Sequence, residues 1–444
     1  KLELESGVPN LDYSKLHLLV SILFDLSSVS KEDIKSLIDR CYENKEKSWI
    51  QKSLYKVVKK RILSGIGNFH FLNEFPELVV KLAWKEWKYS LREDNNDDTI
   101  PHRLSDNECW GIKNGNFFPS GIYKTPFYNL LKIHPIEGIK FIVEFVNYAV
   151  DFYTNTYSNN YYKHNITKID IVIYDNRISS IYASEELWLA FRGHSVTSYL
   201  LESLLMSLEK YLLEMAANNS DTSSTILDYM FEYILENSNN VAPIAVLSSI
   251  IMAYPIKIGK KMLPIFSVKE FYTWDLTRAL KEHSSLAPMD TEIIFAQEER
   301  HNSDQLLHRR KYSRGLLDFV LDYQFNIRIL NDDLFKIFDV LKEKSDNSED
   351  IVWKKNLIEI DIRNQKIGEY DPKLGGFPIY TIYDEEIDDY FEDNKEEEFR
   401  YQESSKYAAL LTKAWKNKDI INYEEWKECY NYYTKINKND VLHS

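Results

Sequence analysis

Apolar residues recur at steps of three and four along nearly the whole chain, and this spacing constrains the fold more than any other feature. The first clear stripe consists of Leu16, Leu19, Val20, Leu23 and Phe24. Such spacing puts apolar side chains on one face of an α-helix. The 444 residues include 13 glycines, and scarce glycine argues against folds that need many tight turns. We therefore predict a mainly all-α protein.

The strongest helical block is residues 198–217, in which leucines line one side and most charges lie elsewhere. Antiparallel pairs of short helices are typical of α-solenoids, and no repeat of fixed period is visible, so we expect an irregular HEAT- or TPR-like α-solenoid. Ser30 is a plausible N-cap for a helix that follows it. Further helices are predicted at 49–62, 78–89, 141–152, 221–235, 241–254, 255–266, 268–280 and 330–341, with one or two long helices across 292–325 and two more near 407–416 and 423–433.

One inserted β-hairpin interrupts the helices. Two β-branched runs within residues 168–182 flank an Asp-Asn turn, a pattern that predicts two paired strands. Residues 367–378 hold three glycines and two prolines, which marks a domain boundary. We predict an N-terminal helical region at 1–160, a central helical-repeat region at 161–366, and an acidic segment with a C-terminal helical arm at 367–444.

The charge is acidic and uneven. The net charge is −14, and residues 384–400 carry ten acids against Lys395 and Arg400. Nucleic-acid-binding surfaces are normally basic, so no nucleic acid partner is expected. No apolar run is long enough to span a bilayer and no signal peptide is visible, so no membrane partner is expected either. Three distant cysteines form no disulfide framework, which predicts a cytoplasmic protein.

The most suggestive catalytic match is Gly193-His194-Ser195-Val196-Thr197. It shares three positions with the GxSxG elbow that exposes a nucleophilic serine. Thr197 replaces the last glycine, and the residues before the match look helical. The alternative interpretation is a turn between helices in which Ser195 caps the second helix.

Two features could bind a metal ion or a partner. His301 and His308 would share a helix face seven residues apart, with Glu298 nearby, but helical metal pairs sit three or four residues apart. The densest basic patch lies at residues 308–314, and from it we predict that His308, Arg309, Arg310 and Arg314 bind a partner. The alternative interpretation is a solvated charged face of a helix. No phosphate-binding loop is present, so no cofactor is predicted for this chain.

Three stretches resemble a known family: residues 186–214 (ELWLAFRGHSVTSYLLESLLMSLEKYLLE), residues 241–255 (VAPIAVLSSIIMAYP) and residues 299–311 (ERHNSDQLLHRRK). They look like the helical part of very large bacterial STAND-type NTPases of the AVAST antiphage defence kind. The resemblance implies a sensor region that binds a phage structural or packaging protein and signals to attached NTPase and effector domains. It also implies that ATP and Mg²⁺ bind only to an attached NTPase domain, through which the protein could form homo-oligomers.

The chain lacks the Walker motif and the effector signature of that family and begins with Lys1, so we expect it to be part of a longer protein. We therefore predict a recognition module without enzymatic activity of its own. Two alternatives stay open: an enzyme of unrecognised class, hydrolase-like and centred on Ser195 with His301 or His308, and a purely structural helical scaffold.

Overall fold

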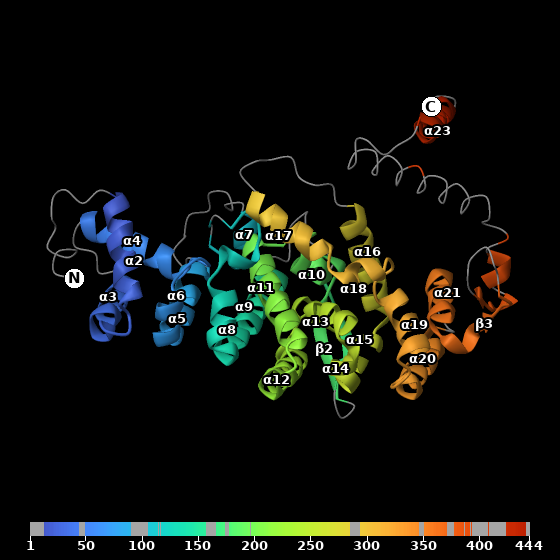
Figure 1. Cartoon of the computed structure of the whole chain (residues 1–444), viewed down its shortest axis with the longest axis horizontal. Coiled ribbons are helices and arrows are strands. Elements are labelled where there is room, and N and C mark those ends of the chain that lie inside the picture. The colour runs from blue at the N-terminus through green and yellow to red at the C-terminus, as the bar shows by residue number, and fades with distance from the viewer. Residues whose placement is uncertain are drawn as a thin grey trace. The chain divides into compact units, whose positions relative to one another are not determined.

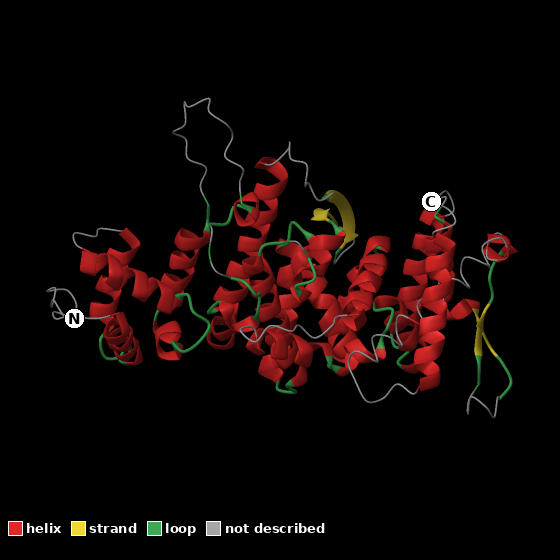
Figure 2. Ribbon diagram, turned by 90° about the horizontal axis from the view of Figure 1, so that it is seen from above, coloured by secondary structure: helices red, strands yellow, loops and turns green. Residues whose placement is uncertain are grey.

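The computed structural model of the chain is mainly helical, with two small antiparallel β-hairpins (Figures 1 and 2). A solenoid is not detected in the part of the chain that it describes. The described residues are 13–43, 49–89, 105–113, 115, 117–156, 166–173, 177–195, 197–284, 294–345, 350–370, 377–385, 387–390, 392, 407 and 423–440.

The chain divides into two compact units. Unit 1 comprises residues 1–278 and 298–311, and unit 2 comprises residues 279–297 and 312–444. The segment 298–311 therefore belongs to unit 1, although the residues on both sides of it belong to unit 2. Of the predicted boundaries, the one at 160/161 lies outside the described residues, and the one at 366/367 falls inside a β-strand.

Among the N-terminal helices of unit 1, Trp49–Ile62 and Pro76–Trp87 lie within two residues of their predictions, and Pro135–Thr156 is longer than predicted. The short helices Phe69–Glu74, Asp106–Cys109 and Phe127–Ile133 were not predicted. The stripe on the first helix is confirmed, because Leu16, Val20 and Phe24 are buried while Leu19 and Leu23 are partly so. The helices are α2 (Tyr13–Asp25), α3 (Lys31–Glu43), α4 (Trp49–Ile62), α5 (Phe69–Glu74), α6 (Pro76–Trp87), α7 (Asp106–Cys109), η1 (Ile122–Lys124), α8 (Phe127–Ile133) and α9 (Pro135–Thr156).

The centre of unit 1 is α11 (Tyr199–Ala217), which packs against α8, α12 (Asp221–Asn237) and α13 (Val241–Ala253). It is buried on nearly all sides, so its polar residues Glu202 and Glu209 are buried as well as its leucines. The predicted hairpin is confirmed as β1 (Thr167–Val172) paired with β2 (Ile178–Ala183). The short α10 (Glu185–Leu189) and η3 (Ala190–Arg192) connect the hairpin to the turn before α11.

The helix predicted at 255–266 is broken into three short pieces. Residues 255–266 form α14 (Pro255–Ile258), η4 (Gly259–Met262) and α15 (Leu263–Phe266), because Gly259 adopts φ 57°, a conformation that favours glycine.

Among the described helices, no single one is long and apolar enough to cross a bilayer. Only α13 taken together with 255–266 reaches that length, and the two are bent by 116°. The next helix is α16 (Lys269–Ser284).

The stretch predicted as one or two long helices is three shorter ones. They are α17 (Ile294–Asp304), α18 (Leu307–Lys311) and α19 (Leu316–Asn326), and Gly315 with φ 59° precedes the third. The division matters because α18 and the end of α17 belong to unit 1 whereas α19 belongs to unit 2.

Unit 2 packs α21 (Ile351–Ile360) against α19 and α20 (Asn331–Ser345). The short η6 (Ile362–Asn364) leads into a second hairpin, β3 (Gln365–Ile367) paired with β4 (Ile379–Thr381). Neither α21 nor this hairpin was predicted. The glycines and prolines within 367–378 lie in sequence between these two strands, and residues 371–376 among them are outside the described residues. The predicted C-terminal helix is confirmed as α23 (Tyr423–Asp440), and the one near 407–416 lies outside the described residues apart from Tyr407.

Candidate functional site

Ser195 lies in a polar turn that follows helical residues, not a strand. Its hydroxyl lies 2.7 Å from Thr197 Oγ1 and donates to Glu202 Oε1 at 3.3 Å. A serine nucleophile needs a histidine base at that distance, whereas the partners of this hydroxyl are a threonine and a buried carboxylate. The predicted capping role is wrong too, because Ser198 is the N-cap of α11 and accepts from the Leu200 amide. The geometry therefore gives the hydrolase alternative no support.

The two histidines lie on different helices and do not share a face. His301 is exposed on α17, whereas His308 of α18 is buried with its Nε2 atom 3.0 Å from Ser249 Oγ. Among the described residues, no group of three or more His, Cys, Asp or Glu side chains is placed to hold a metal ion.

The predicted basic patch is divided between two environments. His308 and Arg309 are buried in unit 1, so a partner could reach them only if α18 moved. Arg310 is exposed. Arg314 lies in unit 2, where its guanidinium pairs with Asp318 at 2.8 Å and Glu359 at 2.7 Å. Partner binding thus stays a prediction for Arg310 and Arg314, while His308 and Arg309 form part of the interior.

A chain of ion pairs runs through the core of unit 1. Arg309 of α18 pairs with Glu209 of α11 and also lies 3.4 Å from Ser249 of α13. The other carboxylate oxygen of Glu209 lies 3.6 Å from Arg192, which in turn pairs with Asp304 of α17 at 2.5 Å. Buried charges are costly unless paired, so these contacts fix how α17 and α18 sit on α11.

Glu202 forms a second buried polar centre on α11. Ser120 donates to one of its oxygens at 2.6 Å and itself accepts from Arg300 of α17. Burial raises the pKa of Glu202 to about 7, and the hydrogen bond from Ser120 and the positive charge of Arg300 offset only part of this effect. Glu299 contributes another polar contact, accepting from the Ile122 amide at 2.7 Å.

The three stretches that carry the family resemblance meet at these buried contacts. Residues 186–214 contain Arg192, Glu202 and Glu209, residues 241–255 contain Ser249, and residues 299–311 contain Arg309. Their polar side chains bond to one another in the interior of unit 1. These buried residues therefore serve packing, and a surface that binds a target has to lie on exposed residues.

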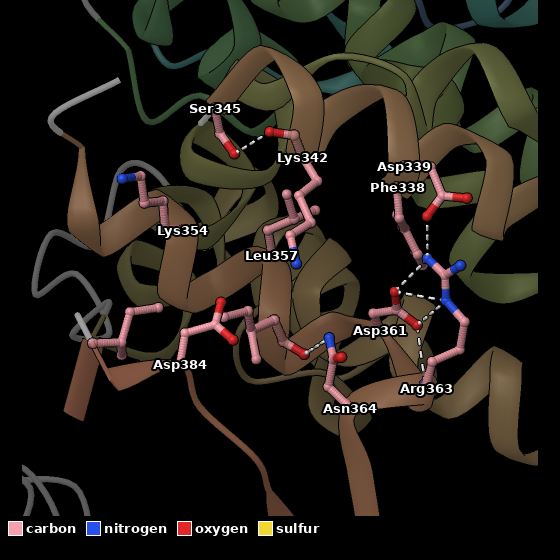
Figure 3. A pocket seen from close by; sticks show the side chains of 12 residues that line it. Phe338, Asp339, Lys342, Ser345, Lys354, Leu357, Asp361, Arg363, Asn364 and Asp384 are labelled. Atoms are coloured by element: carbon pink, nitrogen blue, oxygen red, sulfur yellow. Dashed lines mark hydrogen bonds and ion pairs between the residues drawn. The ribbon is translucent and has the colours of Figure 1, made fainter. Parts of the chain in front are cut away.

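Unit 2 has a cavity of about 410 Å³ between α20, α21 and the residues that follow β4. Figure 3 shows Lys342 extending into this space from α20, while Arg363 is turned toward Asp361 and Asp339 at one wall. The guanidinium lies 2.6 Å from Asp361 and 2.7 Å from Asp339. These hydrogen bonds raise the pKa of Arg363, with Asp361 the larger cause, and the bond to Arg363 lowers that of Asp339.

The charges around this cavity balance. Lys342, Lys354 and Arg363 face the carboxylates of Asp339, Asp361 and Asp384. A balanced lining favours neither an anionic nor a cationic ligand. The cavity is therefore a weak candidate for a small-molecule site.

The β3–β4 hairpin beside this cavity exposes large apolar side chains on both faces. Antiparallel pairing places Ile367 directly opposite Ile379, and both therefore lie on one face. Tyr380 lies on the other face, and so does Ile382, which continues the ladder by donating to the Asn364 carbonyl at 2.9 Å. The exposed fractions are 62% for Ile367, 49% for Ile379, 58% for Tyr380 and 59% for Ile382.

Side-chain hydrogen bonds anchor the base of the hairpin to α21. The Tyr383 hydroxyl donates to Glu359 Oε1 at 2.9 Å, and the Gln365 side-chain Nε2 donates to the Glu359 backbone carbonyl at 2.9 Å. Farther along, the exposed rings of Tyr370 and Phe377 contact each other edge to face, with centroids 5.4 Å apart. Figure 2 shows the two strands as a narrow ribbon that stands apart from the helices. We call residues 365–370 and 377–383 the apolar hairpin.

Sequence reasoning missed the apolar hairpin, although a signal was present. Residues 379–383 read Ile-Tyr-Thr-Ile-Tyr, a run of β-branched and aromatic residues that favours a strand. The glycines and prolines before it outweighed this signal.

No protein-family model matches the chain, and no curated protein matches it.

Proposed function

We propose that this chain is a protein-recognition module and that the apolar hairpin of unit 2 is its contact surface. The observation that carries the proposal is the exposure of large apolar side chains on both faces of a two-stranded sheet. Clustered exposed apolar surface marks interaction sites. An isolated two-stranded hairpin is also only marginally stable in water, so a bound protein that covers it would stabilise it.

The proposed class of protein is the sensor part of a bacterial antiphage defence protein. The resemblance of residues 186–214, 241–255 and 299–311 supports this part of the proposal. The partner would be a phage structural or packaging protein, and any ATPase or effector activity would belong to attached domains in the cytoplasm. Within the same proposal, unit 1 is an irregular HEAT- or TPR-like array. The succession of helices α11, α12 and α13, which pack against one another, supports that description.

Binding measured against a panel of purified phage structural and packaging proteins tests this function. The hairpin is altered once on each face, by Ile379→Glu and by Tyr380→Glu. The matched control is Val352→Glu, which charges an apolar residue of similar exposure on α21. We expect one phage protein to bind the wild-type chain and the control equally, and both hairpin variants at least about tenfold more weakly, because each buries a charge in an apolar contact.

Two results would contradict the proposal. In the first, none of the phage proteins binds the wild-type chain. In the second, a phage protein binds, but the hairpin variants retain the affinity of the Val352→Glu control.

A further inference from the structure

We propose that the free edge of β4 binds an extended, apolar segment of the partner protein as a third strand, with basic residues preceding the apolar run. This inference rests on the proposed function and specifies the chemistry of its partner. It follows from three properties of the apolar hairpin: its open edge, its two apolar faces and the acidic residues that follow it.

The hydrogen-bond register leaves backbone groups of β4 pointing outward. The Gly368 amide donates to the Pro378 carbonyl at 2.8 Å, and the Ile382 amide donates to the Asn364 carbonyl at 2.9 Å. Bonded and non-bonded positions alternate in an antiparallel pair, so Ile379 and Thr381 direct their N–H and C=O groups away from β3. Within the part of the chain that the structure describes, this sheet has two strands, and this edge can therefore accept another strand.

The edge of β4 is better suited to strand addition than the edge of β3. Lys366 and Glu369 flank Ile367 on the β3 side, and charged residues commonly protect edge strands from pairing. The β4 side continues as Ile379-Tyr380-Thr381-Ile382, which favours an extended backbone.

The exposed faces define the side chains that a third strand needs. Successive residues of a strand point to opposite faces. A strand beside β4 would place one residue against Ile379 and the next against Tyr380 or Ile382, and all three are about half exposed or more. Consecutive apolar residues, rather than an alternating pattern, therefore fit this position.

The charge after β4 selects basic residues at one end of the segment. Asp384, Glu385, Asp388 and Asp389 are exposed directly beyond the strand. In an antiparallel third strand, the residues beside this end of β4 precede the apolar run. Lysine or arginine there would meet carboxylates, which is complementary across the contact.

The test uses the full chain and a labelled synthetic peptide, Lys-Lys-Arg-Val-Ile-Tyr-Val-Thr, with binding measured by fluorescence anisotropy. A second peptide carries N-methyl groups on the backbone amides that would face β4, and a third replaces the basic residues with glutamate. We expect both to bind at least about tenfold more weakly than the first, because one lacks backbone donors and the other repels the acidic residues.

Two proline variants separate the two edges. Thr381→Pro removes an outward N–H and leaves the ladder to β3 intact, since proline is tolerated where the N–H of an edge strand faces solvent. Ile367→Pro makes the equivalent change on the edge of β3. We expect Thr381→Pro to weaken peptide binding at least about tenfold and Ile367→Pro to leave it within about threefold, with circular dichroism showing unchanged helix content in both.

Equal binding of the plain and N-methylated peptides, or no binding of the plain peptide, would overturn strand addition. A dimer of the chain that Thr381→Pro dissociates would overturn it too, because a second copy would then occupy the edge. None of these three results decides the proposed function, which depends on loss of phage-protein binding by Ile379→Glu and Tyr380→Glu.

Discussion

At the scale of single residues, two buried glutamates of α11, Glu202 and Glu209, differ in the partners of their carboxylates. Glu209 is compensated by Arg309 and Arg192. Glu202 instead accepts hydrogen bonds from Ser120 and Ser195, and burial raises its pKa to about 7. Replacing the carboxylate by an amide should therefore have different consequences at the two positions.

Glu202→Gln should remove a pH dependence from stability. The pKa of Glu202 in the folded protein, about 7, lies above its ordinary value of 4.5. Between these values the folded state holds a proton that the unfolded state has released, so the free energy of unfolding falls as pH rises, by about 1.4 kcal/mol per pH unit. Above the folded pKa this loss is complete.

Urea unfolding of Glu202→Gln and the wild type from pH 5 to pH 8 measures this effect. The variant should gain stability relative to the wild type as pH rises to about 7, and the difference should then stay constant. The exposed Glu343→Gln serves as the control and should keep the wild-type pH profile. A constant difference between Glu202→Gln and the wild type across the whole range would show that the carboxyl ionises normally.

Arg309→Met should destabilise the chain by about 3–5 kcal/mol, because it leaves a buried carboxylate with a single, more distant arginine. Arg310→Met is a matched control at the next, exposed position and should change stability by no more than about 0.5 kcal/mol. Denaturant unfolding measures both. Combining Arg309→Met with Glu209→Gln should cost less than the sum of the two single changes, and an additive result would mean that the pair does not interact.

At the scale of elements, polar side chains at helix ends join neighbouring elements of unit 1. Asn240 is the N-cap of α13 and accepts from the Ala242 amide at 3.0 Å. The same side chain donates to Asn147 of α9 at 3.1 Å. The adjacent Asn239 carbonyl accepts from the Tyr182 amide of β2 at 2.8 Å. One short turn therefore links a helix start, a second helix and the first hairpin.

Asn240→Ala should cost about 2–3 kcal/mol, because it leaves the buried Ala242 amide uncapped and removes the hydrogen bonds that the Asn240 side chain donates to Asn147 and Asn239. Ser220→Ala is the control, since Ser220 caps α12 at an exposed helix start and its loss should cost about 1 kcal/mol or less. Thermal and urea unfolding compare the two. Equal costs would mean that the contacts of Asn240 to α9 contribute nothing beyond capping.

At the scale of the whole molecule, the path of the chain is the main feature. Residues 298–311 belong to unit 1, although their neighbours on both sides belong to unit 2. The contacts of this segment with the rest of unit 1 are mainly polar. Arg300, Asp304 and Arg309 form ion pairs or hydrogen bonds with other residues of unit 1. Leu306 and Leu307, in contrast, are exposed.

Hydrogen exchange should reveal this arrangement. Backbone amides of 300–311 should lose protection together with α11 and α13 as urea is raised, while α19–α21 should follow their own transition. Mass spectrometry of peptic fragments measures both sets. If the 300–311 amides instead exchanged with α19–α21, this segment would unfold with unit 2 rather than with unit 1.

The sequence by itself determined most of the longer helices. Helical periodicity depends on residues three and four apart, so α2, α4, α11 and α12 could be predicted within a few residues. Breaks were harder to place, since Gly259 and Gly315 adopt positive φ only where packing turns the chain. The β3–β4 pairing joins strands separated by 11 residues. The local spacing of residue types indicates a pairing over that distance only weakly.

Only the tertiary structure decided which charged and apolar residues are available to a partner. The basic run at 308–314 reads as one patch in sequence, but Arg309 meets Glu209 one hundred positions away and is buried. Conversely, the apolar side chains of Ile379 and Tyr380 are exposed, which their residue types do not indicate. The physical reason is that burial depends on contacts between distant segments, whereas the sequence pattern records local spacing alone.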